Sequence, residues 1–473
     1  MIKKYLNTQI ISKKNLLYIF FTVFNLFLLL LLVKNKLPFA LSILKYHKLY
    51  YYPIFKLNQP TLQFICFIFI LLNYSKIISF FKFRGAIKVF IFILIVFFFI
   101  IINLKLRGNL YSRIAVSSEI NEILLKSKEI KLDNLSSIYK FYQNTYKRTQ
   151  DVTKINHLIS RNPGYGIFFY LIFLISKYLM FDPEILSGLL ILFFYTVSIG
   201  VLYYTITAIY SEHKLSVFAF LCLFFLNPYI ISQLPSFDIL LQSLSVFSIS
   251  LFFKINDKRT TITVILFSFL LFFFYTLSSA ALVLYFYFGI LLFYNNRIVF
   301  FKFFGVTALL LLIYTIFLFY LNFDFQTIFI LPVQYHLIFS KFLRETNEYS
   351  IMQCYLHNIT FFLFSTGPAI IFAFIAALFK YKVNYNKKFK IYVIVFIATF
   401  LLLTLIQNQA IETDRLWLFL TPFFFIFIFN QCDNDRCFFR WVLFNQILFY
   451  LIIFHLVPLH LTADDLKNLI QLR

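Results

Sequence analysis

Long apolar runs recur from one end of the chain to the other, and they constrain the fold more than any other feature. Leu17 to Leu32, Lys88 to Leu104 and Lys390 to Ile406 are each close to the length that spans a bilayer. The runs do not alternate polar and apolar residues, as strands of a membrane β-barrel would. A soluble protein of 473 residues could not bury a chain that is 61% hydrophobic. The sequence therefore predicts an integral, multi-pass membrane protein of the all-α class.

The apolar runs also set the expected number of helices. Neighbouring runs can merge or break, so we expect a polytopic transmembrane bundle of about 11–14 helices in one membrane domain, residues 1–473. The runs begin near Leu17, Leu62, Lys88, Tyr165, Ile185, Leu215, Ile239, Ile262, Ala280, Phe303, Tyr355, Lys390, Leu416 and Trp441.

Two connections between the runs are long. The first, residues 105–163, has apolar residues at roughly helical spacing, which predicts amphipathic helices that lie on the membrane surface. The second, residues 322–353, carries His336, Lys341 and Arg344.

The formal net charge is +24, and the basic residues gather in short loops. This pattern favours control of topology by the positive-inside rule and argues against nucleic acid as a partner. Attraction to anionic lipid headgroups, or to an anionic lipid-linked substrate, is a second use. The loops expected on the cytoplasmic side are residues 254–259, 297–302, 380–390 and 436–440.

This orientation places the second long connection, Asp238 and the segment around Glu412 on the extracytoplasmic side. A basic N-terminus followed by three helices puts the first connection there as well. Two full spans between Gly164 and Ser211 would then move Asp238 to the cytoplasm, whereas an odd number of crossings restores agreement. The alternative is an outer N-terminus with a cytoplasmic first connection.

Three short polar stretches border apolar runs, and the first is Ser160 to Gly166. Pro163 suits the first turn of a helix, and Gly164 and Gly166 allow another backbone to approach closely. A plain helix start is the alternative to a functional role.

The second stretch, Pro235-Ser236-Phe237-Asp238, follows Asn227-Pro228 at a polar elbow between two apolar runs. The carboxylate of Asp238 is either a catalytic group or a helix cap that satisfies backbone donors and favours the helix dipole.

The third stretch runs from Glu412 to Trp417. It places two acids, Glu412 and Asp414, and one arginine, Arg415, next to an apolar run. Ionisable groups at such a boundary are costly to hold and often functional. Arg415 suits bidentate phosphate binding, and a nearby carboxylate suits a general base. Alternatively, Arg415 and Trp417 are interfacial anchors, with the acids as salt-bridge partners.

Two further carboxylates, Glu119 and Glu122, lie in the first long connection at i, i+3 spacing and would share a helical face. One of them is a candidate general base, and solvated surface charges are the alternative.

Taken in order, these stretches resemble the GT-C superfamily of integral membrane glycosyltransferases, including polyprenyl-phosphate-sugar-dependent, mannosyltransferase-like proteins. Many members end their first large outer loop in a His-Pro-Pro-Gly-like stretch, of which Ser160 to Gly166 looks like a degenerate version. Arg161 stands where that stretch has His, and Asn162 where it has its second Pro. Some multi-pass relatives carry a Gly-Glu-x-x-Arg-Leu-Trp-like segment, which Ile411 to Trp417 resembles more closely.

The resemblance implies a GT-C-like fold and sugar transfer, with inversion, from a polyprenyl-phosphate-linked donor to an acceptor on the extracytoplasmic side. It leaves the acceptor open. A carboxylate would take the acceptor proton, and cations would hold the lipid-phosphate leaving group. The implied catalytic candidates are Glu119, Glu122, Asp238 and Glu412, and the substrate- and phosphate-binding candidates are Arg161, Asn162, Tyr165, Arg415 and Trp417. Some members use a divalent metal and others do not, and no convincing acidic cluster assigns metal ligands here.

Other functions stay open. A polymerase or ligase of lipid-linked glycans would use His336, Lys341 and Arg344 of the second long connection. A transporter or flippase would show charges deep in several helices or a pair of inverted repeats, and neither pattern is evident. A purely structural membrane protein is the remaining alternative.

Overall fold

Helices make up almost all of the structure, as the apolar runs predict. The computed structural model describes residues 22–23, 85–106, 114, 162–209, 234–258, 261–324, 330, 341, 350–367, 370–375, 387–406, 418–424, 441–442 and 444–446. No strand occurs among these residues, which places their fold in the all-α class. The elements are α5 (Gly85–Leu106), α9 (Pro163–Leu179), α10 (Pro183–Ile209), α13 (Phe237–Lys258), α14 (Thr261–Leu277), α15 (Ala281–Asn295), α16 (Arg297–Tyr320), α18 (Ile351–Thr366), α20 (Lys387–Ile406) and the 3₁₀ helix η4 (Leu418–Leu420).

Most of these helices begin slightly before the apolar run that predicts them, because polar residues and prolines make the first turn. The Asn296 side chain accepts hydrogen bonds from the backbone N–H groups of Ile298 and Val299, at 3.0 and 3.2 Å, and caps α16. Ser350 and Gln353 exchange side-chain and backbone hydrogen bonds at the start of α18, which forms a capping box. The runs expected near Leu62 and Leu215 lie outside the described residues, as does most of the first long connection.

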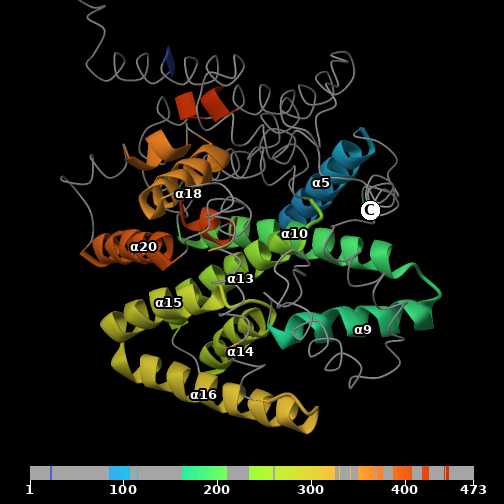
Figure 1. Cartoon of the computed structure of the whole chain (residues 1–473). Coiled ribbons are helices and arrows are strands. Elements are labelled where there is room, and N and C mark those ends of the chain that lie inside the picture. Colours follow the sequence, from blue (N-terminus) through green and yellow to red (C-terminus); the bar gives the residue numbers. More distant parts are fainter. Residues whose placement is uncertain are drawn as a thin grey trace, which may run out of the picture.

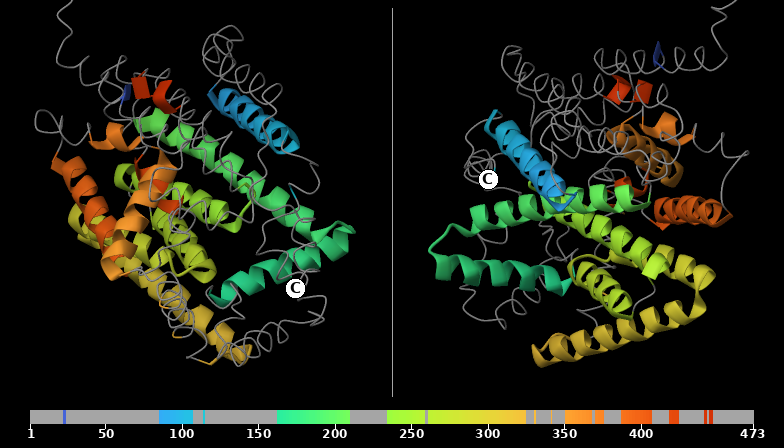
Figure 2. Two further views of the ribbon diagram at one scale, coloured as in Figure 1. Left: turned by 45° about the horizontal axis from the view of Figure 1, so that its top comes forward. Right: turned by 180° about the vertical axis from the view of Figure 1, so that it is seen from behind.

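Helix α13 lies at the centre of the bundle. It packs against α10, α14, α15 and η4, and the ribbon runs between α10 and α14 (Figures 1 and 2). Within the described residues, three helices are long and apolar enough to cross a membrane: α10, α13 and α16. The apolar window of α13 is 78% buried, whereas that of α16 is only 17% buried. Helix α13 is therefore an interior helix, and α16 is peripheral.

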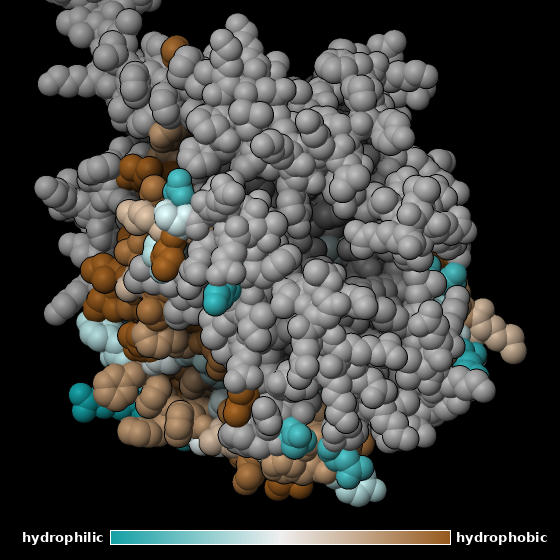
Figure 3. All heavy atoms as spheres, in the orientation of Figure 1, coloured by the Kyte–Doolittle hydropathy of each residue, from teal (hydrophilic) through white to brown (hydrophobic). Residues whose placement is uncertain are grey.

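The outer face of α16 carries a band of exposed apolar side chains. Phe304, Leu312 and Ile316 are each more than half exposed, and similar residues continue along the helix. Figure 3 shows apolar side chains over the left and lower edges of the molecule, where α15, α16 and α20 lie in Figure 1. A band of this kind is unfavourable in water and favourable in lipid, so it indicates membrane association.

Helix ends that adjoin basic segments lie near one another in the described part of the bundle. The Lys302 ammonium donates to the Thr261 hydroxyl at 3.3 Å, which joins the starts of α16 and α14. The Asn295 amide donates to the Tyr392 hydroxyl at 2.7 Å, which joins the end of α15 to the start of α20. Three of the four segments expected on the cytoplasmic side adjoin these helix ends. These segments would therefore lie on the same side of a membrane, and the side itself stays a prediction.

Close helix contact depends on a few glycines. A Cβ atom added at Gly188 of α10 would collide with the carbonyl oxygen of Ile114, whereas one added at Gly305 of α16 would meet nothing within 4 Å. Gly188 thus permits a backbone approach that any side chain would block.

We therefore expect Gly188→Ala to lower the free energy of unfolding by about 1–3 kcal/mol, the usual cost of overpacking. Gly305→Ala is the matched control, and we expect it to be neutral or to stabilise α16 by about 0.5–1 kcal/mol. Thermal unfolding of both variants in detergent measures the difference. Equal melting temperatures would contradict the close contact at Gly188.

Candidate functional site

Asp238 lies in the first turn of the central helix. It is the second residue of α13 and is 1% exposed. The N-cap residue of α13 is Ser236, whose backbone carbonyl accepts a hydrogen bond from the backbone N–H of Ile239 at 3.1 Å. The carboxylate still benefits from the positive end of the helix dipole. The structure therefore sets Asp238 inside the first turn rather than at the cap position.

The start of α9 lies beside the start of α13. The ring of Tyr165 meets the ring of Phe237 edge-on, with centroids 4.4 Å apart. Both side chains are almost completely buried. Tyr165, in the described part of the Ser160-to-Gly166 stretch, thus adjoins the residue immediately before Asp238, although the two are far apart in the sequence.

The start of α9 is also fixed against the end of α14. The Asn162 amide donates a hydrogen bond to the carbonyl oxygen of Tyr275, which is close to the C-terminus of α14. Carbonyls in the last turn of a helix have no partner within the helix, so Asn162 satisfies one of them. A Cβ atom added at Gly164 would collide with the Thr276 carbonyl. The close backbone approach predicted for Gly164 is confirmed.

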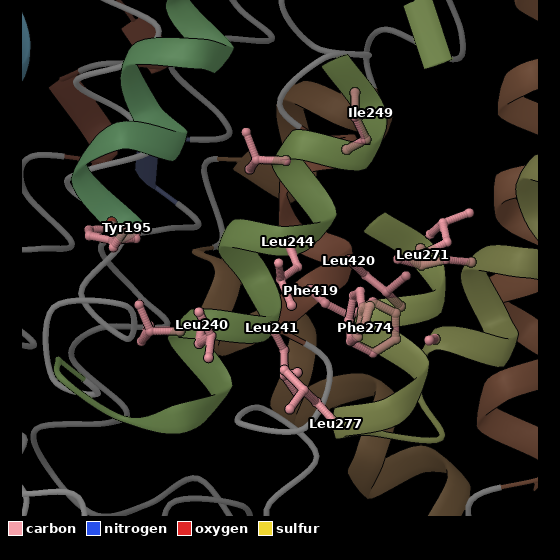
Figure 4. Packing of buried hydrophobic residues seen from close by; sticks show 14 of the residues in the cluster. Tyr195, Leu240, Leu241, Leu244, Ile249, Leu271, Phe274, Leu277, Phe419 and Leu420 are labelled. Carbon is pink, nitrogen blue, oxygen red and sulfur yellow. The ribbon is translucent and has the colours of Figure 1, made fainter. Parts of the chain in front are cut away.

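The segment that follows Trp417 packs against the same part of α13. The Gln242 amide donates to the Thr421 hydroxyl at 2.6 Å across 179 residues of sequence. The Ser245 hydroxyl donates to the carbonyl oxygen of Phe419 at 2.7 Å across 174 residues. Figure 4 shows Phe419 and Leu420 close to Leu244 of α13 and Phe274 of α14. Residues 419 and 421, which follow the Glu412-to-Trp417 stretch in the sequence, therefore lie against α13.

Asp238, Gln242 and Ser245 form one polar face of α13. Their i, i+4, i+7 spacing places them on the same side of a helix, and all three are buried. Within the described part of the chain, the Ser236 hydroxyl and the Gln242 side-chain carbonyl have no hydrogen-bond partner. The Ser236 hydroxyl oxygen and the Gln242 side-chain oxygen, on either side of Asp238 in the sequence, can therefore accept hydrogen bonds from another group.

Of the predicted site residues, the structure describes Asn162, Tyr165 and Asp238, and it packs the start of α9, which holds the first two, against the start of α13, which holds the third. The other candidates lie outside the described residues, namely Arg161, Glu119, Glu122, Glu412, Arg415 and Trp417. Sequence reasoning missed Gln242, Ser245 and Thr421. Helical spacing from Asp238 identifies the first two, but nothing in the sequence pairs them with a segment more than 170 residues later.

The described residues contain no group of three or more His, Cys, Asp or Glu side chains that could hold a metal ion. Asp238 is a buried acidic residue in the first turn of α13, next to Phe237, which packs against Tyr165 of α9. The described part of α13 offers a buried carboxylate with an amide and hydroxyl groups nearby on the same helix.

Comparison with known protein families, curated proteins and solved structures finds no match to this chain. The likeness to GT-C glycosyltransferases therefore rests on the short polar stretches and on their order along the chain.

The hydrogen bond of Asn162 gives a direct test of the junction between α9 and α14. Asn162→Ala leaves the Tyr275 carbonyl without its donor, and we expect a loss of about 1–3 kcal/mol of stability. Asn162→Asp should cost more, because it also places a negative charge at the negative end of the α14 dipole. Melting temperatures in detergent rank the variants, and an Asn162→Asp variant as stable as wild type would rule out the junction.

Proposed function

We propose that this protein is an integral, multi-pass membrane glycosyltransferase of the GT-C type. It transfers a sugar from a polyprenyl-phosphate-linked donor to an acceptor on the extracytoplasmic side, with α13 carrying the catalytic carboxylate, Asp238.

The observation that supports the proposal is the packing of two distant segments, the start of α9 and residues 419–421, against the N-terminal half of α13, which carries Asp238. Tyr165 contacts Phe237, Asn162 binds the end of α14, and Thr421 binds Gln242. An enzyme that joins a lipid-linked donor to an acceptor needs its base and its phosphate-binding groups in one place.

The chemistry suits a single buried carboxylate. An acceptor oxygen attacks the anomeric carbon and forms the new glycosidic bond, while the bond from that carbon to the phosphate oxygen breaks. Asp238 accepts the acceptor proton as general base. The polyprenyl phosphate leaves with the bonding electron pair, and Arg415, with Arg161, neutralises its charge. The free acceptor atoms of Ser236 and Gln242 suit the hydroxyl groups of a sugar.

The membrane setting agrees with this reaction. The basic helix ends lie opposite the start of α13 in the α13–α16 hairpins, which favours an extracytoplasmic Asp238 by the positive-inside rule. The apolar face of α16 provides contact with lipid. An isoprenoid tail needs only apolar helix surface, which the bundle supplies in excess.

Polymerisation or ligation of lipid-linked glycans is the main alternative, and it would centre on His336, Lys341 and Arg344. Of these, Lys341 is the residue that the structure describes, and its side chain is exposed. It does not belong to the set of residues that meets at α13, so sugar transfer at Asp238 is the better supported reaction.

Substitution of the carboxylate tests the proposed base. We expect Asp238→Asn to lower sugar transfer by about 10²- to 10⁴-fold, the usual contribution of a general base. Asp324→Asn, which changes an exposed carboxylate after α16, should leave transfer unchanged. The assay follows radiolabelled sugar from polyprenyl-phosphate-mannose and polyprenyl-phosphate-glucose in membranes that contain each variant. Wild-type turnover by Asp238→Asn would remove Asp238 from the mechanism.

The C-terminal motif is tested separately. We expect Arg415→Ala and Glu412→Gln to abolish transfer while membrane insertion stays intact, because a phosphate-binding cation and its neighbouring carboxylate act on the substrate and not on the fold. Transfer activity normalised to the amount of inserted protein is the measurement. If both variants turn over donor at the wild-type rate, the motif is an interfacial anchor.

A further inference from the structure

Helix α16 combines an exposed apolar face with two basic side chains near its start. The helix runs along the lower edge of the bundle in Figure 1, where it packs against α14 and α15. Phe301, Phe304 and Leu309 are each more than half exposed, and Arg297 and Lys302 are exposed as well. Contact of an apolar face with lipid needs no charge, so the two cations need a separate explanation.

Both basic side chains keep most of their hydrogen-bond donors for another group. The Lys302 ammonium, which has three donors, gives one to the Thr261 hydroxyl at 3.3 Å. The Arg297 guanidinium lies over the Phe293 ring, 5.2 Å from its centroid, and this contact uses no oxygen acceptor. Helices α14, α15 and α16 contain no acidic residue. These three helices therefore offer no carboxylate that would neutralise either cation.

Arg297 and Lys302 flank the outward face of α16. Residues five apart on an α-helix differ by about 140° around its axis and by about 7.5 Å along it. Phe301 and Gly305 lie between the two cations on this face, at four-residue spacing. A Cβ atom added at Gly305 would meet nothing within 4 Å, so the surface recedes there beside the exposed Phe301 ring. The cations therefore border a face that has room for an acyl chain.

The length of α16 places this face at the membrane boundary. Its 24 residues span about 36 Å at about 1.5 Å per residue, which exceeds a hydrocarbon core of about 30 Å. Tyr320 is exposed at the other end and suits the opposite interface. Arg297 then lies among the headgroups, and the long side chain of Lys302 reaches the same level from further along the helix.

The electrostatics of this face favour an anion. Arginine and lysine side chains both bind phosphate oxygens. Lys302 also joins the starts of α14 and α16, so the positive ends of two helix dipoles lie together. A zwitterionic phospholipid carries a compensating cation in its headgroup, whereas phosphatidylglycerol carries a net negative charge. A phospholipid with an anionic headgroup therefore complements both the charge and the apolar surface of this face.

We propose that residues 297–309 of α16, with Thr261 of α14, form a binding site for an anionic phospholipid. Its phosphate lies between Arg297 and Lys302, and an acyl chain follows the exposed face past Gly305. The site does not depend on sugar transfer at Asp238, because it lies on a peripheral helix and needs only a bilayer.

Quenching of tryptophan fluorescence by brominated lipid tests the site. Full-length Phe301→Trp protein is placed in vesicles of equal parts phosphatidylglycerol and phosphatidylcholine, with one lipid or the other brominated. Emission from the two native tryptophans is subtracted by means of wild-type protein in the same vesicles. We expect a preference for phosphatidylglycerol of about fivefold at this position, because two nearby cations attract an anionic headgroup.

Further variants assign the preference to the two cations. Phe319→Trp reports on the far end of the same exposed helix, and we expect both lipids to quench it equally. Arg297→Gln together with Lys302→Gln, added to Phe301→Trp, should reduce the preference to about twofold or less. The matched control, Arg297→Lys together with Lys302→Arg, keeps both charges and should retain the preference.

Three results would each overturn the site. The first is equal quenching of Phe301→Trp by the two lipids. The second is the same preference in Phe301→Trp and Phe319→Trp, which would show a general attraction of a chain with net charge +24 for anionic lipid. The third is a preference that survives removal of both cations, because its cause would then lie elsewhere.

Discussion

The free-energy cost of leaving a polar group without a hydrogen bond inside an apolar bundle determines which segments pack around the central helix of this structure. Helix α13 is the most buried of the three candidate membrane-spanning helices, yet it carries an acid, an amide and several serines on its buried surface. Side-chain hydrogen bonds between membrane helices contribute about 0.6 kcal/mol on average and up to about 1.7 kcal/mol. The penalty for an unmade bond is larger, so these groups dictate which segments can pack against α13.

The partners of α13 come from distant parts of the chain for this reason. Thr421 and the Phe419 carbonyl bond to Gln242 and Ser245, while aromatic packing joins Tyr165 to Phe237. Leu and Phe side chains elsewhere in the bundle can exchange neighbours at little cost, because one apolar surface resembles another. Directional hydrogen bonds cannot be exchanged in this way, and they give the candidate site a defined geometry in an otherwise uniform apolar core.

Much of the fold was predictable because the signals are local. Helices α5, α9, α10, α13, α14, α15, α16, α18 and α20 each fall on an expected apolar run. Boundaries moved by a few residues where Pro163, Asn296 or the Ser350–Gln353 pair made the first turn. Which helix lies inside was not predictable from hydropathy. Helices α10 and α16 are both strongly apolar, and only packing shows that the first is half buried and the second faces outward.

By itself, the sequence determined the all-α class, the helix positions, the close approach at Gly164 and the polar stretches that deserve chemical interest. Hydrophobic period, capping residues and the steric freedom of glycine act within a few residues of their own position, so they can be read along the chain. The tertiary structure alone decided that Asn162 binds the end of α14 and that Gln242 binds Thr421. Those pairings depend on helix packing across more than 100 residues, and no local pattern encodes which buried amide meets which acceptor.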